Sequence, residues 1–299
     1  MEERCTAWDS NRITRDYYDS LLIEMRHLDG VLPDTGIKLF GESFGTPVMM
    51  AALSHLQNVR DNGMTEMAKG ARRAGAVMWC GMGDEKELED ITQTGARTVK
   101  IIKPYADRAT VYRKMDHAAK CGAIAVGMDI DHQFGKNGKY DNVLGYEMSP
   151  VSAEELKEFV AASRLPFVVK GVLSVQDAQK CVEAKVSAIV VSHHHGIIPY
   201  AVPPLMVLPE IVKAVDGRLS VFIDCGIESG ADVFKALALG ADAVCVGRTM
   251  MEALRKEGAI GVENKIHAMT EELAGIMART ASPAVNKIDP SVIRRGCSA

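Results

Sequence analysis

PFVVKG at residues 166–171 is followed by three similar runs, AIVVSHHHG at 188–196, SVFIDCG at 220–226 and DAVCVGR at 242–248. Each run is rich in Val and Ile and ends in polar or glycine-bearing residues, which is typical of strands buried on both faces of a parallel sheet. An amphipathic segment at helical spacing follows the runs, as at Val175–Ala184 and Ala231–Leu239. The stretch therefore predicts repeated strand–loop–helix units.

Earlier residues extend the same repeat. Candidate strands lie at 47–51, 76–80, 98–102 and 123–128, with helices expected at 62–74, 84–94, 109–121 and 152–163. Eight such units in about 235 residues match the size of one (β/α)₈ barrel. A doubly wound open sheet is the alternative, but no GxGxxG follows the first strand. We therefore predict an α/β protein with a single TIM barrel.

The two ends of the chain do not carry the repeat. Residues 1–45 are predicted to form a helical lead-in, with a helix over Arg12–Leu28 and a Gly- and Pro-rich part that caps the closed end of the barrel or lies beside its mouth. The barrel is expected over 46–280, closing with a helix at Gly258–Arg279, and 281–299 form a tail. The polar loop Asp131–Pro150 is long enough to be a lid or binding loop.

Bulk properties exclude several classes of partner. Charged residues make up 25% of the 299 and the formal net charge is −4, so neither nucleic acid nor an anionic membrane is expected as a partner. No apolar run approaches the ~20 residues that span a bilayer, and the polar N-terminus lacks a signal-peptide pattern. We therefore expect a cytoplasmic protein. The seven cysteines include no CxxC pair and are expected to be reduced thiols.

In a (β/α)₈ barrel, the residues that follow the strands converge on one mouth, where the active site lies. Gly247-Arg248 follows the last strand and Asp224–Gly230 follows the strand before it. Barrels often bind phosphate with these two loops, through backbone N–H groups and a helix N-terminus. Turn glycines beside a surface arginine are the simpler alternative, but the order of the loops favours a phosphate site.

Titratable residues end three other strands. Lys170 would either be a buried cation paired with a nearby carboxylate or lie beside an anionic or electron-rich ligand, and we favour the ligand, because an unpaired charge inside a barrel costs several kcal/mol. Strand alternation would point His194 away from His193 and His195, and a general base is the leading interpretation of this cluster. Zinc, with Asp224 or Asp129 as a third ligand, is the alternative. Either aspartate could orient a histidine, bind ligand hydroxyls or cap a helix. The weaker candidates, by position alone, are Tyr17, His55, Lys103, His132 and Lys136.

At these residues the chain resembles the FMN-dependent 2-hydroxy acid oxidase and dehydrogenase family. The motifs that carry the resemblance are PFVVKGVLSVQDA, AIVVSHHHG and SVFIDCGIESGADVFKALALGADAVCVGR. Weaker similarity runs from Asp16 to the C-terminal helix. The resemblance implies a barrel with FMN at its mouth, a small-molecule substrate and a homo-oligomer, in particular a homotetramer.

The resemblance also implies roles for individual residues. Lys170 would lie near N1 and the C2 carbonyl of the flavin, and the catalytic base would be His194, or His195 if counted back from Gly196. Asp129 would pair with that base, and Tyr17 would contact the substrate. The residues implied to bind the cofactor are Ala51, Ala52, Lys170, Ser192, Asp224, Gly226, Gly247 and Arg248.

Several positions depart from the family pattern. The substrate-binding arginine expected three residues after the base is Ile197 or Ile198. A second substrate-binding arginine, expected in the loop after the fourth strand, is missing, and the nearest cation there is Lys136. Lys103 stands where the family has a tyrosine, so a substrate carboxylate would rely on point charges such as Lys103. Gly127 replaces a flavin-contacting threonine, and Glu228 replaces a phosphate-binding arginine.

These observations leave three hypotheses. The first is an FMN-dependent oxidoreductase that oxidises a small hydroxy acid or related alcohol by His-assisted proton abstraction and hydride transfer. The second is a barrel lyase or isomerase, possibly metal-dependent, that acts on a phosphorylated substrate. The third is a flavin-binding protein without hydroxy acid turnover.

Overall fold

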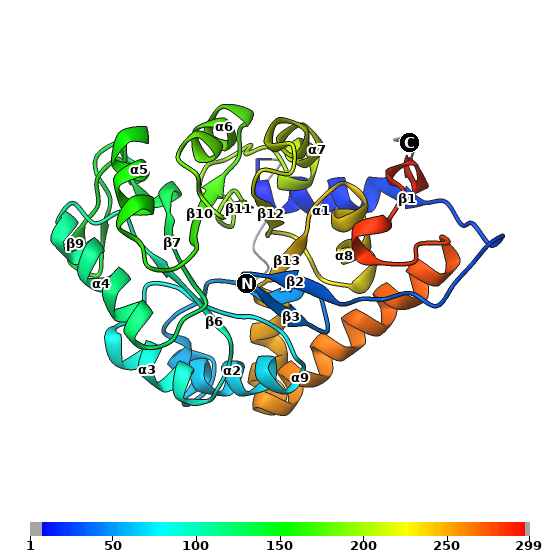
Figure 1. Ribbon diagram of the computed structural model, residues 1–299, viewed down its shortest axis with the longest axis horizontal. Coiled ribbons are helices and arrows are strands. Elements are labelled where there is room, and N and C mark those ends of the chain that lie inside the picture. Colours follow the sequence, from blue (N-terminus) through cyan, green and yellow to red (C-terminus); the bar gives the residue numbers. More distant parts are fainter. Residues whose placement is uncertain (1–7, 297–299) are drawn as a thin grey trace.

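Eight parallel strands form a nearly closed barrel in the computed structural model, which describes residues 8–296 (Figure 1). The strands are β4 (Val48–Met50), β5 (Met78–Cys80), β6 (Thr98–Ile102), β7 (Ala125–Asp129), β10 (Phe167–Val172), β11 (Ala188–Val191), β12 (Ser220–Ile223) and β13 (Ala243–Val246). Their hydrogen-bonded order is β4-β13-β12-β11-β10-β7-β6-β5. Between the two end strands, Met50 N of β4 donates a hydrogen bond of 3.0 Å to the carbonyl of Val77, the residue before β5. The predicted barrel is confirmed.

Helices surround the strands (Figure 1). They are α2 (Gly63–Arg73), α3 (Glu85–Gln93), α4 (Arg108–Lys120), α5 (Ala153–Ala162), α6 (Val175–Glu183), α7 (Pro204–Val215), α8 (Gly230–Ala238) and α9 (Arg248–Arg279). The capping box at the start of α5 is formed: Glu155 N donates to Ser152 Oγ at 3.2 Å, and Ser152 N donates to Glu155 Oε2 at 2.9 Å. Such reciprocal bonds satisfy two N–H groups that a helix end leaves free.

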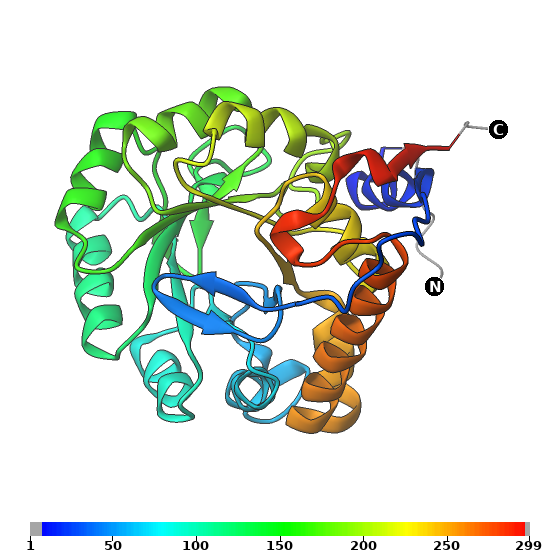
Figure 2. The same cartoon turned by 45° about the vertical axis from the view of Figure 1, so that its right-hand side comes forward.

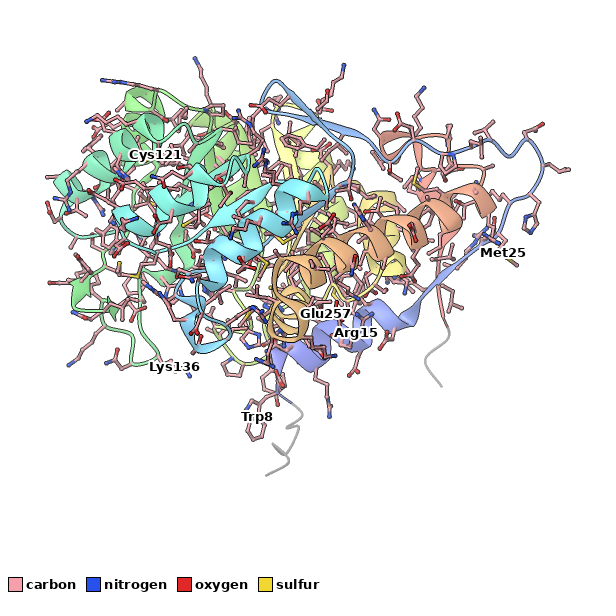
Figure 3. The ribbon with its side chains drawn as sticks, turned by 90° about the horizontal axis from the view of Figure 1, so that it is seen from below. Trp8, Arg15, Met25, Cys121, Lys136 and Glu257 are labelled. Atoms are coloured by element: carbon pink, nitrogen blue, oxygen red, sulfur yellow. The ribbon has the colours of Figure 1, made fainter. Side chains whose placement is uncertain are left out.

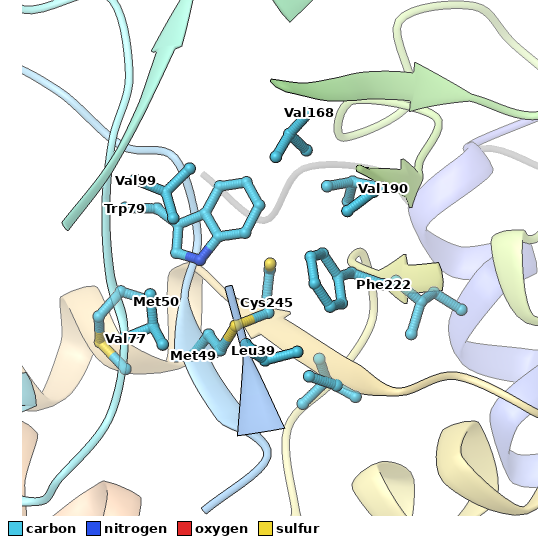
Figure 4. Close-up of a cluster of buried hydrophobic side chains, with 14 of the residues drawn as sticks. Leu39, Met49, Met50, Val77, Trp79, Val99, Val168, Val190, Phe222 and Cys245 are labelled. Atoms are coloured by element: carbon cyan, nitrogen blue, oxygen red, sulfur yellow. The ribbon is translucent and has the colours of Figure 1, made fainter. Parts of the chain in front are cut away.

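Large side chains fill the barrel interior (Figure 4). Trp79 and Phe222 meet edge to face with ring centroids 5.9 Å apart, and both are fully buried. The hairpin of β2 (Ile37–Leu39) and β3 (Glu42–Phe44) lies across one end (Figure 2). The ring of Phe40, at its turn, lies 6.2 Å from that of Phe222. The hairpin also lines a cavity together with Ser220 and Asp242, at the amino ends of the strands. This part of the lead-in therefore caps the closed end.

The first helix is shorter than the sequence predicts. Helix α1 spans Ser10–Ser20, and the chain then becomes extended in β1 (Leu21–Ile23). Strand β1 pairs antiparallel with β14 (Ile293–Arg295), so the predicted tail folds back on the lead-in. The expectation of a helix through Leu28 was wrong, because pairing with a distant segment overrides the local helical periodicity. A pattern of neighbouring residues cannot reveal such a pairing.

The closing helix also differs from the expectation. Helix α9 begins at Arg248, and Gly258, where we expected the helix to start, instead interrupts it with φ 62°. A side chain at Gly258 would meet the guanidinium of Arg60, so the left-handed backbone and the close contact both favour glycine.

The remaining elements are short. They are the 3₁₀ turns η1 (Leu56–Asn58), η2 (Ile130–His132), η3 (Val285–Lys287) and η4 (Pro290–Val292), and the hairpin of β8 (Asn142–Val143) with β9 (Tyr146–Glu147). The five cysteines among residues 8–296 are free thiols, whereas Cys5 and Cys297 lie outside the described residues. No helix in the described part of the chain is long and apolar enough to cross a membrane.

Candidate active site

A cavity of about 350 Å³ opens where five barrel strands end. Seven of the eight predicted cofactor residues line it: Ala51, Ala52, Lys170, Asp224, Gly226, Gly247 and Arg248. His194 and His195 also face this space. The eighth residue, Ser192, does not line the cavity; its buried hydroxyl accepts a hydrogen bond from His194 N at 3.0 Å and shapes the turn.

One end of the cavity suits a phosphate. Gly247 and Arg248 stand at the N-terminus of α9, where the first N–H groups of a helix have no intrahelical acceptor. The guanidinium of Arg248 is exposed there. Thr249 Oγ1 donates to the Ile227 carbonyl at 3.2 Å and joins this end to the loop after β12. Glu228 lines the same end, and its carboxylate opposes an anionic ligand.

Helix α1 closes one side of the mouth and explains a glycine in the loop after β12. Gly226 has φ 77°, and a Cβ there would approach Thr14 of α1 within 2.8 Å. Arg15 of α1 donates to the Gly226 carbonyl at 2.7 Å and binds both carboxylate oxygens of Asp232, at 2.9 and 2.8 Å. These contacts hold the lead-in helix against the loops that line the cavity.

The three histidines after β11 separate as predicted. His193 is buried, with Nε2 2.7 Å from Thr14 Oγ1, and His195 Nδ1 lies 2.7 Å from Asn11 Oδ1, so both contact α1. His194 points elsewhere. Its backbone and that of His195 are left-handed, with φ 46° and 57°, so a tight turn and not strand alternation causes the separation. Two such residues in succession cost about 1–3 kcal/mol each and are typical of functional sites.

His194 enters a buried cluster of charges. Its Nδ1 lies 3.3 Å from Asp129 Oδ2, 2.7 Å from Asp131 Oδ1 and 3.0 Å from Lys170 Nζ. Burial and Lys170 lower the pKa of His194, but hydrogen bonds and charge from Asp129 and Asp131 outweigh them and hold it above the usual value. The structure thus brings His194, and not His195, to Asp129.

Two lysines neutralise Asp129. Lys103 Nζ lies 2.8 Å from its Oδ2, and Lys170 Nζ lies 3.5 Å from its Oδ1. Burial would raise the pKa of Asp129, but these ammonium groups and His194 hold it well below the usual value. Lys170 also faces Asp131 at 3.7 Å and Asp224 at 3.9 Å, so three carboxylates surround one buried ammonium.

The loop after β7 brings to the site His132, a weaker candidate by its position, and two residues that were not predicted there, Asp131 and Asp141. His132 Nε2 lies 3.0 Å from His194 Nε2, and His132 Nδ1 lies 2.9 Å from Asp141 Oδ2. The side chain of Asp131, which is 9% exposed, lies in the same cluster. The position of His132 close to the strand end made it a candidate, whereas the position of Asp141 depends on the fold of the loop.

Two predicted residues lie elsewhere. Tyr17 is half-buried on α1 and does not line the cavity, so its contact with substrate remains a prediction. Lys136 is exposed on the loop after β7 (Figure 3). In the described part of the chain no hydrogen bond or ion pair joins Lys136 to His194.

The cluster bears on the zinc alternative. Asp131, His132 and His194 are close enough to share an ion. Lys170 lies 3.0 Å from His194 Nδ1, however, and its ammonium already provides the positive charge that these carboxylates need. We therefore assign no metal to this cluster.

Comparison with known proteins identifies the family. The model of the FMN-dependent dehydrogenase family matches residues 3–153 and 139–295. The chain belongs to this family. The 4-hydroxymandelate oxidase of Amycolatopsis orientalis is 30% identical, covering 84% of this chain and 80% of its own. The L-lactate oxidase of Lactobacillus jensenii is 27% identical, covering 97% and 78%.

A solved structure supports the same assignment. Mandelate oxidase with (S)-2-phenylpropionate superimposes with a TM-score of 0.88 at 29% identity, covering 98% of this chain and 92% of that chain. The protein is therefore an FMN-dependent oxidoreductase on a TIM barrel, and the lyase or isomerase hypothesis gains no support. The residues present fit the cofactor: the cavity has alanines after β4, glycines after β12 and β13, and Arg248 at a helix N-terminus.

Proposed function

We propose that this protein oxidises a small hydroxy acid or related alcohol with FMN, and that His194 is the base. The observation that carries the proposal is that His194 lines the predicted FMN cavity while its Nδ1 faces Asp129 and Asp131. An imidazole backed by carboxylates can take up a proton because its cation is stabilised. Relatives named as oxidases of lactate and 4-hydroxymandelate support this chemistry.

Each residue has a defined part in this proposal. When bound, FMN supplies the acceptor for the hydride equivalent. The alanines after β4 and the glycines of the phosphate end provide the cofactor surface, and Arg248 binds the phosphate. His194 takes the hydroxyl proton of the substrate, and Asp129 stabilises the resulting imidazolium. Lys170 keeps positive charge in the cavity wall, where it is held by three carboxylates.

The charge balance bears on the substrate. Lys170, 3.0 Å from His194, and Lys103, which binds Asp129, are both paired with carboxylates. Neither presents the bidentate fork that an arginine offers to a carboxylate. For this reason the proposal includes related alcohols as well as hydroxy acids. The homo-oligomeric state, the cytoplasmic location and the division at residues 45 and 280 also remain proposals from the sequence.

Absorption spectroscopy and anaerobic reduction test the proposal. Purified protein should show flavin absorbance and release FMN on denaturation. Anaerobic mixing with a panel of 2-hydroxy acids and neutral 1,2-diols should then bleach that absorbance. A protein that binds FMN but is bleached by no member of a broad alcohol panel would instead fit the third hypothesis, a flavin-binding protein without turnover.

Arg248→Ala is expected to weaken FMN binding by about 10–100-fold, because a charge-assisted hydrogen bond contributes about 1.5–3 kcal/mol. Glu228→Gln should act in the opposite direction, since it removes a negative charge from the phosphate end. Titration of apoprotein with FMN, followed by quenching of flavin fluorescence, measures both. Riboflavin, which lacks the phosphate, is the matched control: its affinity should respond much less to either change.

A further inference from the structure

Two neighbouring helices of the outer ring, α3 and α4, bring together a glutamate, a histidine and a cysteine. His117 and Cys121 lie four residues apart at the end of α4, on the same face, and Cys121 N donates to the His117 carbonyl at 2.9 Å. Glu89 of α3 reaches them, with Oε1 3.2 Å from His117 Nε2. None of the three lines the FMN cavity, and Figure 3 shows Cys121 well apart from Lys136 of the loop after β7.

The possible ligand atoms of this cluster have nearly the spacing of a tetrahedral metal site. Cys121 Sγ lies 3.4 Å from His117 Nε2, and the three atoms all lie within 4.8 Å of one another. With Zn–N and Zn–O bonds of about 2.1 Å and a Zn–S bond of about 2.3 Å, a tetrahedral zinc ion separates its ligand atoms by about 3.4–3.6 Å. The Glu89 side chain is 45% exposed, so it is free to rotate toward an ion held by the other two.

Hydrogen bonds alone leave the cluster incompletely paired. His117 Nε2 carries either a proton or a lone pair, so it cannot serve both of the groups that it faces. If it donates to Glu89, the thiol of Cys121 has only Nδ1 as an acceptor, 3.8 Å away and farther than Nε2. A zinc ion pairs all three groups at once, because it binds imidazole nitrogen, thiolate and carboxylate.

The charges around the cluster also favour a cation. Among the described residues, no lysine or arginine forms an ion pair with Glu89. Glu85, one turn earlier on α3, adds a second negative charge near the sulfur of Cys121, offset in part by Arg113 at 3.7 Å. In the active-site cluster, by contrast, the ammonium of Lys170 already provides the positive charge.

We propose that Glu89, His117 and Cys121 bind one zinc ion, with water as the fourth ligand. Zinc displaces the thiol proton, which passes to solvent, so the sulfur binds as a thiolate. The ion then joins α3 to α4 on the outside of the barrel and stabilises the folded chain by mass action. Closed structural sites have four protein ligands, so a site with three should exchange its zinc with a chelator.

Equilibrium dialysis of the FMN-bound protein against zinc chloride, after removal of metals with a chelator, tests the site. Elemental analysis should find one zinc ion per chain that Cys121→Ser binds at least about 100-fold more weakly, because changes to groups behind the ligands already cost 10–100-fold in metal affinity. His132→Gln removes a possible ligand from the cluster beside His194 and is the matched control. It should bind this zinc as the wild type does.

Two further measurements report on the ligands directly. Co²⁺ in place of zinc should give the intense absorption bands of a four-coordinate site at longer wavelengths than the flavin bands, and Cys121→Ser should abolish them. Zinc should also slow the alkylation of Cys121, measured by peptide mass spectrometry, because a bound thiolate is not free to react. His117→Gln should remove that protection.

Several results would overturn the zinc site. A wild-type protein that retains no zinc would do so, and equal binding by Cys121→Ser would mean an adventitious ion only. Loss of the zinc in His132→Gln, with Cys121→Ser unchanged, would place the ion in the active-site cluster. Unchanged alkylation of Cys121 at saturating zinc would show that its sulfur is not a ligand. None of these measurements depends on the proposed oxidation.

Discussion

His194→Ala is expected to slow reduction of the bound flavin by about 10²–10⁴-fold, the usual contribution of a general base. The variant should keep its FMN, because His194 contributes one side chain to a cavity that other strand ends also line. Anaerobic rapid mixing with any alcohol that bleaches the wild type measures the rate. The flavin spectrum before mixing confirms that the cofactor is retained.

His195→Gln is the matched control for this change. His195 lines the same cavity and follows the same strand, but its Nδ1 contacts Asn11 and not a carboxylate. We expect its effect on the rate to stay within about tenfold, which is below the range of a lost base. A larger loss in His195→Gln than in His194→Ala would transfer the role of base to His195.

The pH dependence of flavin reduction gives an independent check on His194. A base works in its neutral form, so the rate should rise as the pH passes above the pKa of His194. Because Asp129 and Asp131 raise that pKa, the rising limb should lie above the ordinary histidine value of about 6.5. Asp129→Asn removes one of the two carboxylates, so the limb should move to lower pH. An unchanged limb would show that Asp129 does not set the protonation of His194.

The repeat made the barrel predictable because each buried strand and each amphipathic helix is a local pattern. Strand β6 has the predicted bounds, and the α5 capping box formed as expected. Prediction from the sequence failed where two distant segments pair with each other. Nothing within residues 12–28 indicates that the chain leaves the helix at Leu21 to pair with Arg295. For the Gly- and Pro-rich segment that forms the capping hairpin, the sequence left two placements open: the closed end of the barrel and the side of its mouth.

In the site, residues at or near strand ends were predictable, and residues farther along the long loop were not. Lys170 lies near the end of β10, and Asp224 and Arg248 come just after β12 and β13, so the barrel itself brings them to one cavity. Asp141 reaches the site through the hydrogen bonds of an irregular loop, and such contacts leave no periodic pattern. The left-handed turn at His194 was equally hidden, since positive φ is uncommon for any residue other than glycine and a single histidine does not identify it.

Lys170→Met is expected to lower the free energy of unfolding by about 3–5 kcal/mol at neutral pH, the usual cost of removing one partner from a buried ion pair. Lys170 is 6% exposed and faces Asp129, Asp131 and Asp224. Methionine has a similar volume, so little of the loss reflects a cavity. Lys103 still neutralises Asp129 in the variant, which leaves Asp131 and Asp224 as the uncompensated carboxylates. Urea denaturation of both proteins in the same excess of FMN measures the difference.

The pH dependence and a second substitution separate lost charge from lost packing. Burial lowers the pKa of Lys170, but the three carboxylates outweigh it and raise that pKa, so its stabilisation is complete at neutral pH and is lost only in strong alkali. Towards acid, the advantage of the wild type should shrink as its carboxylates protonate. The depressed pKa of Asp129 stabilises the folded protein fully only above the ordinary pKa of an aspartate, and this stabilisation is lost as the pH falls.

Adding Asp131→Asn to Lys170→Met should restore part of the stability, because one uncompensated charge disappears. Lys256→Met, on the exposed face of α9, should change stability by no more than about 0.5 kcal/mol. A double variant less stable than Lys170→Met alone would mean that Asp131 is held by something other than the ammonium of Lys170.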